Sequence, residues 1–319
     1  MRRKLVVLGL LVAAALGFYF VQGWNGSGPA RESTSVVIPR GASLVSAAAT
    51  LKRAGVISST SRFLFQAKLF GGKRAIFAGE YEFPAHASYK KILTMLQSGK
   101  TLQRFVVIPE GLPSVLVQDR LVQAPALTGE AALPEEGSVL PDSYSYQRGE
   151  KRTAVLGRMQ AAMRKTLDRL WPERSPDSVV RTKAEALTLA SIVEKETAKP
   201  SERPMIAGVY GNRLKAGMPL QADPTIIYPI TRGRPLGRQI LKSEVEAHNG
   251  YNTYTMRGLP AGPIANPGRA SIEAVLKPAR TDALYFVADG TGGHVFANTL
   301  AEHNANVVKW RALRRERGI

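Results

Sequence analysis

The apolar positions between residues 182 and 198 recur with the spacing of an α-helix. The face that they define, at about 100° per residue, comprises Leu189, Ile192 and Val193. Thr182 and Glu185 have the T-x-x-E spacing of a capping box. The pattern therefore predicts a helix that begins at this point.

Two glutamates near the end of this helix have different expected surroundings. Glu196 follows Ile192 by four residues and lies on the apolar face, whereas Glu194 projects to the opposite side, where we expect it to be solvated. Burial disfavours the charged form of a carboxyl and raises its pKa, which suits a general acid near neutral pH. Glu196 is therefore the candidate catalytic residue. An ion pair with Arg203 or Arg213 is the alternative, purely structural role for it.

A second pattern, in which short β-rich runs alternate with amphipathic helical stretches, covers residues 36–100. It predicts a small β-α-α-β-like subdomain, completed by a further helix. The expected elements are a strand near 36–38, helices from 44 and over 60–69, a strand over 79–83 and a helix over 89–97. The hexapeptide VVIPRG at residues 36–41 recurs as VVIPEG at 106–111. An internal repeat is one interpretation of this similarity, and chance is the other.

Residues 101–319 carry a mixed helical and β pattern. Helices are expected over 152–170, 201–217 and about 300–315, and a strand over 283–288 turns into a hairpin at 294–298. The intervening residues 250–268 are rich in Gly, Asn, Pro and Tyr and are expected to be irregular. The chain is thus predicted to have an α+β fold, with a small subdomain followed by a larger mixed domain.

The N-terminus has the composition of a membrane anchor. Residues 1–4 are basic, and residues 5–21 carry no charge and would reach about 26 Å as a helix. We expect a transmembrane helix over 5–22, with residues 1–4 in the cytoplasm and the rest of the chain outside. A cleaved signal peptide is the alternative, but aromatic residues at 18–20 stand where a cleavage region needs small ones. The polar residues 23–35 are predicted to form a linker.

Composition excludes several kinds of chemistry. The 319 residues include no cysteine, so disulfides, thiol nucleophiles and thiolate metal sites are impossible. The net charge is +19, yet the Lys and Arg residues are scattered, so we do not expect nucleic acid as a partner. A basic cluster at 309–317 is expected to lie on a solvated helix, with attraction to anionic lipid or an acidic wall polymer as an option. The sequence predicts neither a metal site nor a cofactor, because its four histidines are far apart and it contains no P-loop or dinucleotide-binding motif.

Two polar loops follow the candidate glutamate in the sequence. The candidate substrate-binding side chains in these loops are Gln221, Asp223, Asn252 and Tyr254. Amides, carboxylates and phenols hydrogen-bond to sugar hydroxyls, and aromatic rings stack on sugar rings. The alternative is that these residues only close turns.

A series of longer motifs resembles the YceG-like endolytic murein transglycosylases. In chain order these motifs are ASIVEKET (190–197), SER (201–203), NRL (212–214), LQADPT (220–225), YNTY (251–254), GLP (258–260) with PI (263–264), and YFVA (285–288). The resemblance spans about residues 36 to 310. It implies a LysM-like subdomain over 36–100 and a catalytic domain over 101–319. It also implies that the second glutamate of the E-K-E-T motif, Glu196, is catalytic.

The resemblance further implies a reaction. The expected activity is cleavage of the β-1,4 bond between N-acetylmuramic acid and N-acetylglucosamine in nascent glycan strands, which leaves a 1,6-anhydro end and terminates elongation. Glu196 would protonate the glycosidic oxygen and then take the proton of the muramic acid C6 hydroxyl. The loop residues would position the glycan or hold the active-site loops, and Glu202 would be structural, paired with Arg203 or Arg213. The enzyme would be a lyase, because no water enters the product.

Other functions remain open at this stage. A non-catalytic protein could bind peptidoglycan, a scaffold could organise peptidoglycan synthases through its membrane span, and a muramidase could hydrolyse the same bond. The expected location is the inner membrane, with one span, a cytoplasmic N-terminus and a periplasmic C-terminal domain. Peptidoglycan strands are the expected substrate, and peptidoglycan synthases are expected partners.

Overall fold

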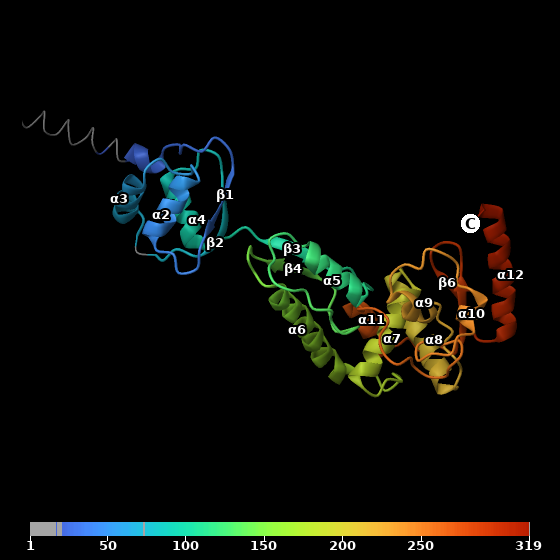
Figure 1. Ribbon diagram of the computed structural model, residues 1–319. Helices are drawn as coiled ribbons and strands as arrows, with labels where there is room; N and C mark the ends of the chain where they lie inside the picture. Colours follow the sequence, from blue (N-terminus) through green and yellow to red (C-terminus); the bar gives the residue numbers. More distant parts are fainter. Residues whose placement is uncertain (1–16, 18–20, 73, 319) are drawn as a thin grey trace, which may run out of the picture. The chain divides into compact units, whose positions relative to one another are not determined.

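The computed structural model describes Gly17 and residues 21–72 and 74–318, and Figure 1 shows the path of the chain. The chain divides into two compact units. Unit 1 comprises residues up to Arg104 together with Ser145–Arg148, and unit 2 comprises Phe105–Tyr144 and Gly149–Ile319. Helices and short antiparallel strands occur in both, so the predicted α+β class is confirmed.

Unit 1 has the predicted order of elements. It contains β1 (Thr34–Ile38), α2 (Leu44–Arg53), α3 (Thr60–Phe70), β2 (Gly79–Phe83) and α4 (Tyr89–Ser98). The two strands pair antiparallel, with Val36 opposite Tyr81. Each helix begins at a serine whose side chain accepts a hydrogen bond from the backbone three residues later, as the N-caps Ser43, Ser59 and Ser88 show. Alternate strand residues and the helix faces enclose one apolar core.

The segment predicted to be a linker is held against unit 1. Trp24, in a short helical turn over residues 21–25, is 7% exposed and belongs to the core of this unit. Gly28 N donates to His86 O at 3.1 Å, and His86 N donates to Ala30 O at 2.7 Å. These contacts fix residues 24–30 on the surface of the unit, so they do not act as a flexible spacer.

The predicted cytoplasmic residues 1–4 and nearly all of the predicted transmembrane helix 5–22 lie outside the described residues. Within the part of the chain that the structure describes, no helix combines the length and the apolar content needed to cross a bilayer.

The remaining elements continue the α+β pattern. In chain order they are β3 (Arg104–Val107), α5 (Ser114–Gln123), β4 (Ser143–Tyr146), α6 (Arg152–Leu170), the 3₁₀ turn η1 (Trp171–Glu173), α7 (Lys183–Glu196), the 3₁₀ turn η2 (Pro200–Glu202), α8 (Arg203–Lys215), α9 (Pro224–Thr231), α10 (Lys242–Val245), α11 (Arg269–Leu276), β5 (Tyr285–Ala288), β6 (His294–Ala297) and α12 (Leu300–Arg317). β3 pairs with β4, and β5 with β6. The helices predicted over 152–170 and from 300, and the hairpin near 290, are all present.

The two copies of the repeated hexapeptide lie in the same order of elements. In each, a strand ends at a Pro-x-Gly turn and a helix follows, β1 and α2 in one case and β3 and α5 in the other. The glycines, Gly41 and Gly111, have φ values of 76° and 70°. This left-handed conformation strains residues that carry a Cβ, which explains why glycine ends both hexapeptides.

Helix α7 is the central helix of unit 2. Its N-cap is Thr182, whose side chain accepts from Glu185 N at 3.1 Å, as predicted. The Glu185 carboxylate accepts from Arg181 N at 2.5 Å, one residue before the N-cap, so only half of the predicted capping box forms. α7 packs against α8, α9 and α11, and every residue from Thr188 to Val193 is buried. The helix is therefore enclosed on more than the one face that its apolar periodicity indicated.

Candidate active site

Glu196 is the last residue of α7, where the helix ends beside α8. The residue is half-buried, but its Oε1 is inaccessible to solvent and has no hydrogen-bond partner among the described residues. Burial raises the pKa of Glu196 to about 7, a hydrogen bond from Tyr210 opposes this rise, Asp223 adds to it, and Arg213 opposes it. A carboxyl in this state holds a proton near neutral pH and can give it up.

Two buried side chains of α8 surround this carboxyl. Tyr210 is 1% exposed, and burial raises the pKa of its phenol well above the usual value, so the hydroxyl stays a neutral donor. Arg213 donates through Nε to Leu284 O at 2.6 Å and through Nη1 to Leu220 O at 3.0 Å. Its guanidinium also lies 5.3 Å from the ring centroid of Tyr285. Carbonyls and a ring thus hold a cation near Glu196.

Three predicted loop residues lie at the same place. Tyr254 donates its hydroxyl hydrogen to Asp223 Oδ1 at 2.5 Å. The charge of Asp223 raises the pKa of Glu196, and the charge of Glu196 raises the pKa of Tyr254. Gln221 Oε1 accepts from Arg213 Nη1 at 3.3 Å. Asp223 and Gln221 are exposed, and Tyr254 is half-buried. The site therefore presents accessible polar groups next to a buried carboxyl.

The backbone at Gln221 adopts an uncommon conformation. Its φ is 54°, in the left-handed region that non-glycine residues rarely enter. Gln221 N donates to Thr253 O at 3.1 Å, and the buried hydroxyls of Thr225 and Thr253 lie 2.8 Å apart. The two polar loops, 28 residues apart in the chain at these threonines, are thus fastened to each other at the site. Such strain persists where surrounding bonds hold it.

The predicted glycan contact at Asn252 is wrong. Asn252 is fully buried, and its Nδ2 donates to Val245 O at 2.9 Å and to Ala247 O at 2.8 Å. Its Oδ1 accepts from Tyr254 N at 3.0 Å. The amide forms its hydrogen bonds with backbone groups, so Asn252 shapes the loop that carries Tyr254. This is the alternative role that the sequence left open for these residues.

The predicted solvation of Glu194 is also wrong. Its side chain is 4% exposed, and Arg203 Nη2 donates to its Oε1 at 2.7 Å. Gly268 N donates to Oε2 at 2.8 Å. The backbone just before α11 covers this side of α7, so the side that periodicity assigned to solvent lies against other segments. Arg203 also reaches Glu110 at 3.0 Å.

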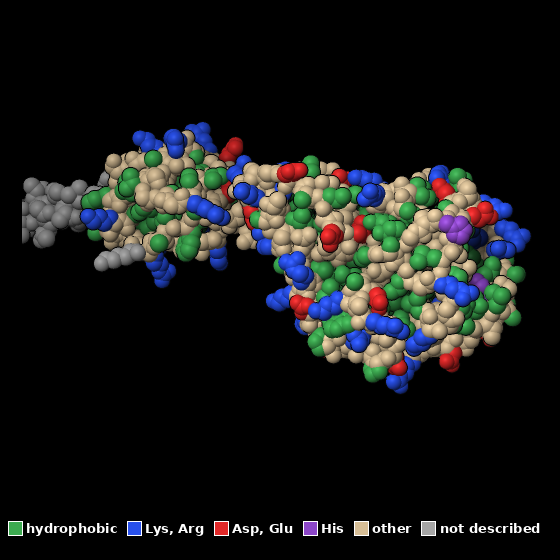
Figure 2. Space-filling model, turned by 60° about the horizontal axis from the view of Figure 1, so that its bottom comes forward, with side chains coloured by type: hydrophobic (Ala, Val, Ile, Leu, Met, Phe, Trp, Pro, Cys, Tyr) green, Lys and Arg blue, Asp and Glu red, His purple; other side chains and the backbone are tan. Residues whose placement is uncertain are grey.

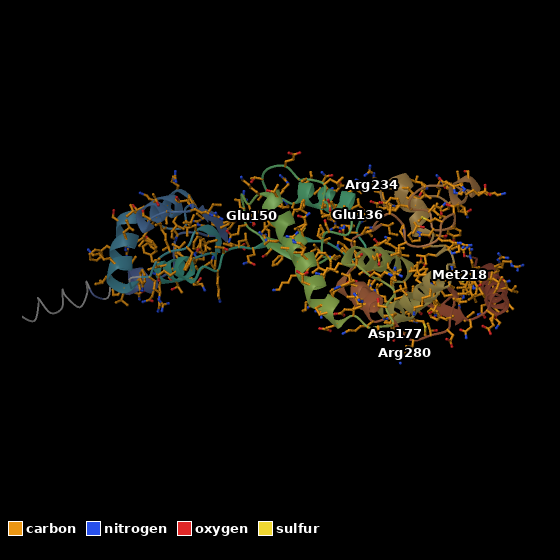
Figure 3. The ribbon with its side chains drawn as sticks, turned by 90° about the horizontal axis from the view of Figure 1, so that it is seen from below. Glu136, Glu150, Asp177, Met218, Arg234 and Arg280 are labelled. Carbon is orange, nitrogen blue, oxygen red and sulfur yellow. The ribbon has the colours of Figure 1, made fainter. Side chains whose placement is uncertain are left out.

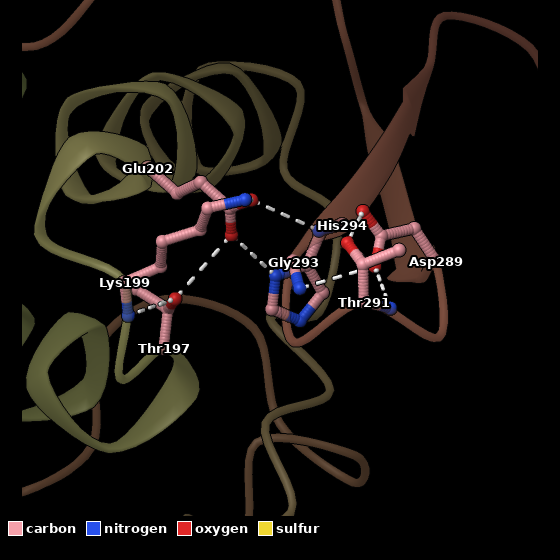
Figure 4. A network of polar contacts seen from close by, with 7 residues as sticks. All are labelled: Thr197, Lys199, Glu202, Asp289, Thr291, Gly293 and His294. Atoms are coloured by element: carbon pink, nitrogen blue, oxygen red, sulfur yellow. Dashed lines mark hydrogen bonds and ion pairs between the residues drawn. The ribbon is translucent and has the colours of Figure 1, made fainter.

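Glu202 has partners other than the two arginines predicted for it. Its Oε2 lies 2.8 Å from His294 Nδ1, its Oε1 accepts from His294 N at 3.0 Å, and Thr197 Oγ1 donates to Oε2 at 3.3 Å. Figure 4 shows this network together with Lys199. Burial raises the pKa of Glu202, but the bonds from His294 outweigh it and lower the pKa overall. The network joins the residue after Glu196 to the β5–β6 hairpin.

Glu136 is another partly buried carboxyl of unit 2, and sequence reasoning missed it. It is labelled in Figure 3. It accepts from Ser114 N at 2.9 Å and from Asn266 Nδ2 at 3.3 Å, and burial raises its pKa despite these bonds and one from Tyr228. Because several segments converge on it, Glu136 fixes the support beneath α9. The residues around it have no periodicity that would have indicated burial.

Tyr210 and Arg213 were also not predicted as site residues. Tyr210 lies within the helix predicted over 201–217 without a role of its own, and Arg213 was considered only as a possible ion-pair partner. The sequence did contain a signal for them: a phenol and a guanidinium lie three residues apart, on a helix face that points to the core. Buried polar groups of this kind need partners, which indicates a site. His, Asp and Glu side chains of the described residues form no group of three that could hold a metal ion.

Comparisons with known proteins cover most of the chain. A family model described as the YceG-like family matches residues 36–309. A Bacillus subtilis protein named endolytic murein transglycosylase is 28% identical, over 90% of this chain and 87% of that protein. A Streptococcus pneumoniae protein of the same name is 30% identical, over 88% of this chain and 58% of that protein. A crystal structure of a YceG-like protein from Listeria monocytogenes matches with a TM-score of 0.53 at 29% identity, over 86% of this chain and 99% of that one.

Proposed function

Because the chain belongs to the YceG-like family, we propose that it is an endolytic lytic transglycosylase of peptidoglycan. It cleaves the β-1,4 bond between N-acetylmuramic acid and N-acetylglucosamine and leaves a 1,6-anhydro end. The relatives named endolytic murein transglycosylase support this activity. The observation that carries it is one buried carboxyl, that of Glu196, with a pKa of about 7 beside exposed polar loops.

The first step breaks the glycosidic bond. The protonated carboxyl of Glu196 donates its proton to the bridging oxygen, which leaves C1 of the muramic acid as the hydroxyl of the departing sugar. Positive charge develops at C1 and its ring oxygen. The Asp223 side chain is exposed at the site, where a carboxylate favours this transition state.

The second step closes the anhydro ring. The C6 hydroxyl of the same muramic acid attacks C1, and its proton passes to the carboxylate of Glu196, which restores the starting enzyme. The hydrogen bond from Tyr210 and the charge of Arg213 both lower the pKa of Glu196, so they stabilise its carboxylate between the two steps. One carboxyl exchanges the proton in both directions, unlike the carboxylate pair of most glycosidases.

The accessible polar groups position the glycan. Gln221 and Asp223 are exposed, and the Tyr254 phenol is aligned by its bond to Asp223. These groups offer an amide, a carboxylate and an aromatic face to sugar hydroxyls and rings. Asn252 acts indirectly, because it holds the backbone that carries Tyr254.

Product analysis tests the proposal. Purified peptidoglycan sacculi are digested with the full chain and with its Glu196→Gln variant, and the masses of the products are measured by mass spectrometry. We expect anhydro-muropeptides from the parent enzyme and a loss of at least about a hundredfold in the variant, as removal of a general acid produces. Products heavier by one water would indicate a muramidase, with Asp223 as its second carboxylate. Intact sacculi with retained binding would indicate a non-catalytic wall-binding protein.

We also propose where the enzyme works. The uncharged run at residues 5–21 after a basic start supports a single inner-membrane span with a cytoplasmic N-terminus and a periplasmic catalytic unit. The order β1, α2, α3, β2 and the antiparallel pairing of its strands support a LysM-like subdomain in unit 1. Nascent strands are then the substrate and peptidoglycan synthases the partners, because both lie at the membrane surface.

A further inference from the structure

Helix α3 of unit 1 exposes apolar side chains. Leu69 is 59% exposed and Phe70 is 41% exposed, and Lys68 beside them is exposed as well. The opposite face of the helix fills the core with Phe63 and Ala67. Single exposed leucines are common on protein surfaces. A binding surface is therefore indicated by where these residues lie, and not by their exposure alone.

The chain that follows the N-terminal apolar run lies directly on α3. The ring of Trp24 is 5.7 Å from that of Phe70, between centroids. A Cβ added to Gly23 would lie 2.3 Å from Arg62 Nη2 and 2.7 Å from Gln66 Nε2. Since residues 62, 66 and 70 form one stripe at a spacing of four, the turn over 21–25 crosses α3 along this stripe.

The exposed side chains adjoin that stripe. At 100° per residue, Leu69 lies about 60° around the helix from Gln66, next to the line along which the turn packs. Val21, the last residue of the uncharged run, is itself 49% exposed. It is separated from Trp24 by about 4.5 Å of helical rise. Apolar surface on α3 thus begins where the apolar run ends.

The charge of unit 1 suits an anionic surface. Residues 21–104 contain twelve Lys and Arg residues and three glutamates. Figure 2 shows Lys and Arg side chains spread over the visible face of this unit, with hydrophobic side chains between them. Lys68 and Arg74, at and just after the C-terminal end of α3, are exposed. Cations next to exposed apolar groups are the composition of segments that lie in the lipid headgroup layer.

We propose that the exposed face of α3, with Val21, Lys68, Leu69 and Phe70, lies in the headgroup region of an anionic phospholipid bilayer. The inference rests on the proposed membrane span. Trp24 is fixed in the core of unit 1, and the uncharged run of the proposed span ends only three residues before it. Unit 1 therefore lies directly at the bilayer surface in this proposal. Leu69 and Phe70 leave water when they enter the interface, and Lys68 meets lipid phosphates. Unit 1 is thereby held at the membrane in one orientation.

Spin labelling tests this directly, because the chain has no native cysteine. The full chain carrying Leu69→Cys is labelled and reconstituted in vesicles of phosphatidylcholine and phosphatidylglycerol. Its matched control is Val37→Cys, since Val37 is 41% exposed and points outward from β1, between the inward-facing Val36 and Ile38. Relaxation is measured with oxygen, which concentrates in lipid, and with a water-soluble nickel chelate.

The expected result is a severalfold higher ratio of oxygen to nickel relaxation at residue 69 than at residue 37. Equal ratios at the two positions, in protein that stays with the vesicles after carbonate washing, would overturn the docking while leaving the span in place. Protein that carbonate releases would overturn the span and the docking together. Neither result bears on the transglycosylase activity, which the digest of sacculi measures separately.

Discussion

Arg203 donates to Glu194 at 2.7 Å, and their side chains are 7% and 4% exposed, respectively. This ion pair joins the last turn of α7 to the first residue of α8. Glu194 stands two residues before Glu196, and its second oxygen accepts from Gly268 N at 2.8 Å. The position of Glu196, the proposed catalytic carboxyl, therefore depends on a neighbouring carboxylate that has no room to contact substrate.

We expect Glu194→Gln to destabilise the protein by about 1–3 kcal/mol, because it leaves the buried Arg203 without its nearest counter-charge. Chemical unfolding of the full chain measures the change. The control is Glu273→Gln, whose partner Arg269 lies one turn away on α11, with both side chains exposed. That exposed pair should contribute no more than about 0.5 kcal/mol. Equal stability of the two variants would show that the buried pair is dispensable.

The pH dependence of the reaction should follow Glu196. In the proposed mechanism its protonated form starts the reaction, and burial raises its pKa to about 7. We therefore expect kcat/KM on glycan strands to fall tenfold per pH unit well above pH 7. A rate that stays level to pH 9 would exclude Glu196 as the proton donor.

The same group should make stability depend on pH. The folded pKa of Glu196 lies above the ordinary value of 4.5, so the folded state binds this proton more tightly than the unfolded state does. Its contribution to stability is full below about pH 4.5 and is lost as the pH rises to about 7. Glu196→Gln should remove this dependence. The measurement is the unfolding free energy of the parent and of Glu196→Gln at pH 5 and at pH 8. The difference between the two proteins should change over this range, whereas a variant of a surface glutamate should show no such change.

Two neighbours of Glu196 should shift the alkaline limb of the profile of kcat/KM against pH in opposite directions. Tyr210 lowers the pKa of Glu196 through a hydrogen bond, so Tyr210→Phe should shift the limb to higher pH. Asp223 raises the pKa through its charge, so Asp223→Asn should shift the limb to lower pH. Profiles of kcat/KM against pH measure both. Shifts of the same sign would mean that the substitutions act through a general change in the loops.

Local signals were enough to predict α7 and to place Glu196 on it. The Thr182 N-cap and the spacing of apolar residues involve neighbours within four positions, and both features are present in the structure. The elements of unit 1 were predicted for the same reason. β1 alternates inward and outward residues, and the helices bury one apolar face.

The partners of the polar residues could not be predicted in this way. Glu194 is buried by Gly268, 74 residues away, and Glu202 is bonded to His294, 92 residues away. Asn252 has the composition of a sugar-binding loop residue, but its amide is consumed by backbone carbonyls that only the folded loop brings near. Helical periodicity assigns one face to solvent, and it fails for α7 because other segments cover that face too.

Asn252 and Gln221 should separate loop structure from glycan contact. Asn252→Ala removes a buried amide that donates to Val245 O and Ala247 O, so we expect a loss of at least about 2 kcal/mol of stability. Gln221→Ala removes an exposed amide, so we expect nearly unchanged stability and a severalfold rise in KM for glycan strands. Unfolding curves and steady-state kinetics of both variants provide the comparison. A destabilised Gln221→Ala with unchanged KM would place Gln221 with Asn252 as a loop residue and leave Asp223 and Tyr254 as the groups that hold the glycan.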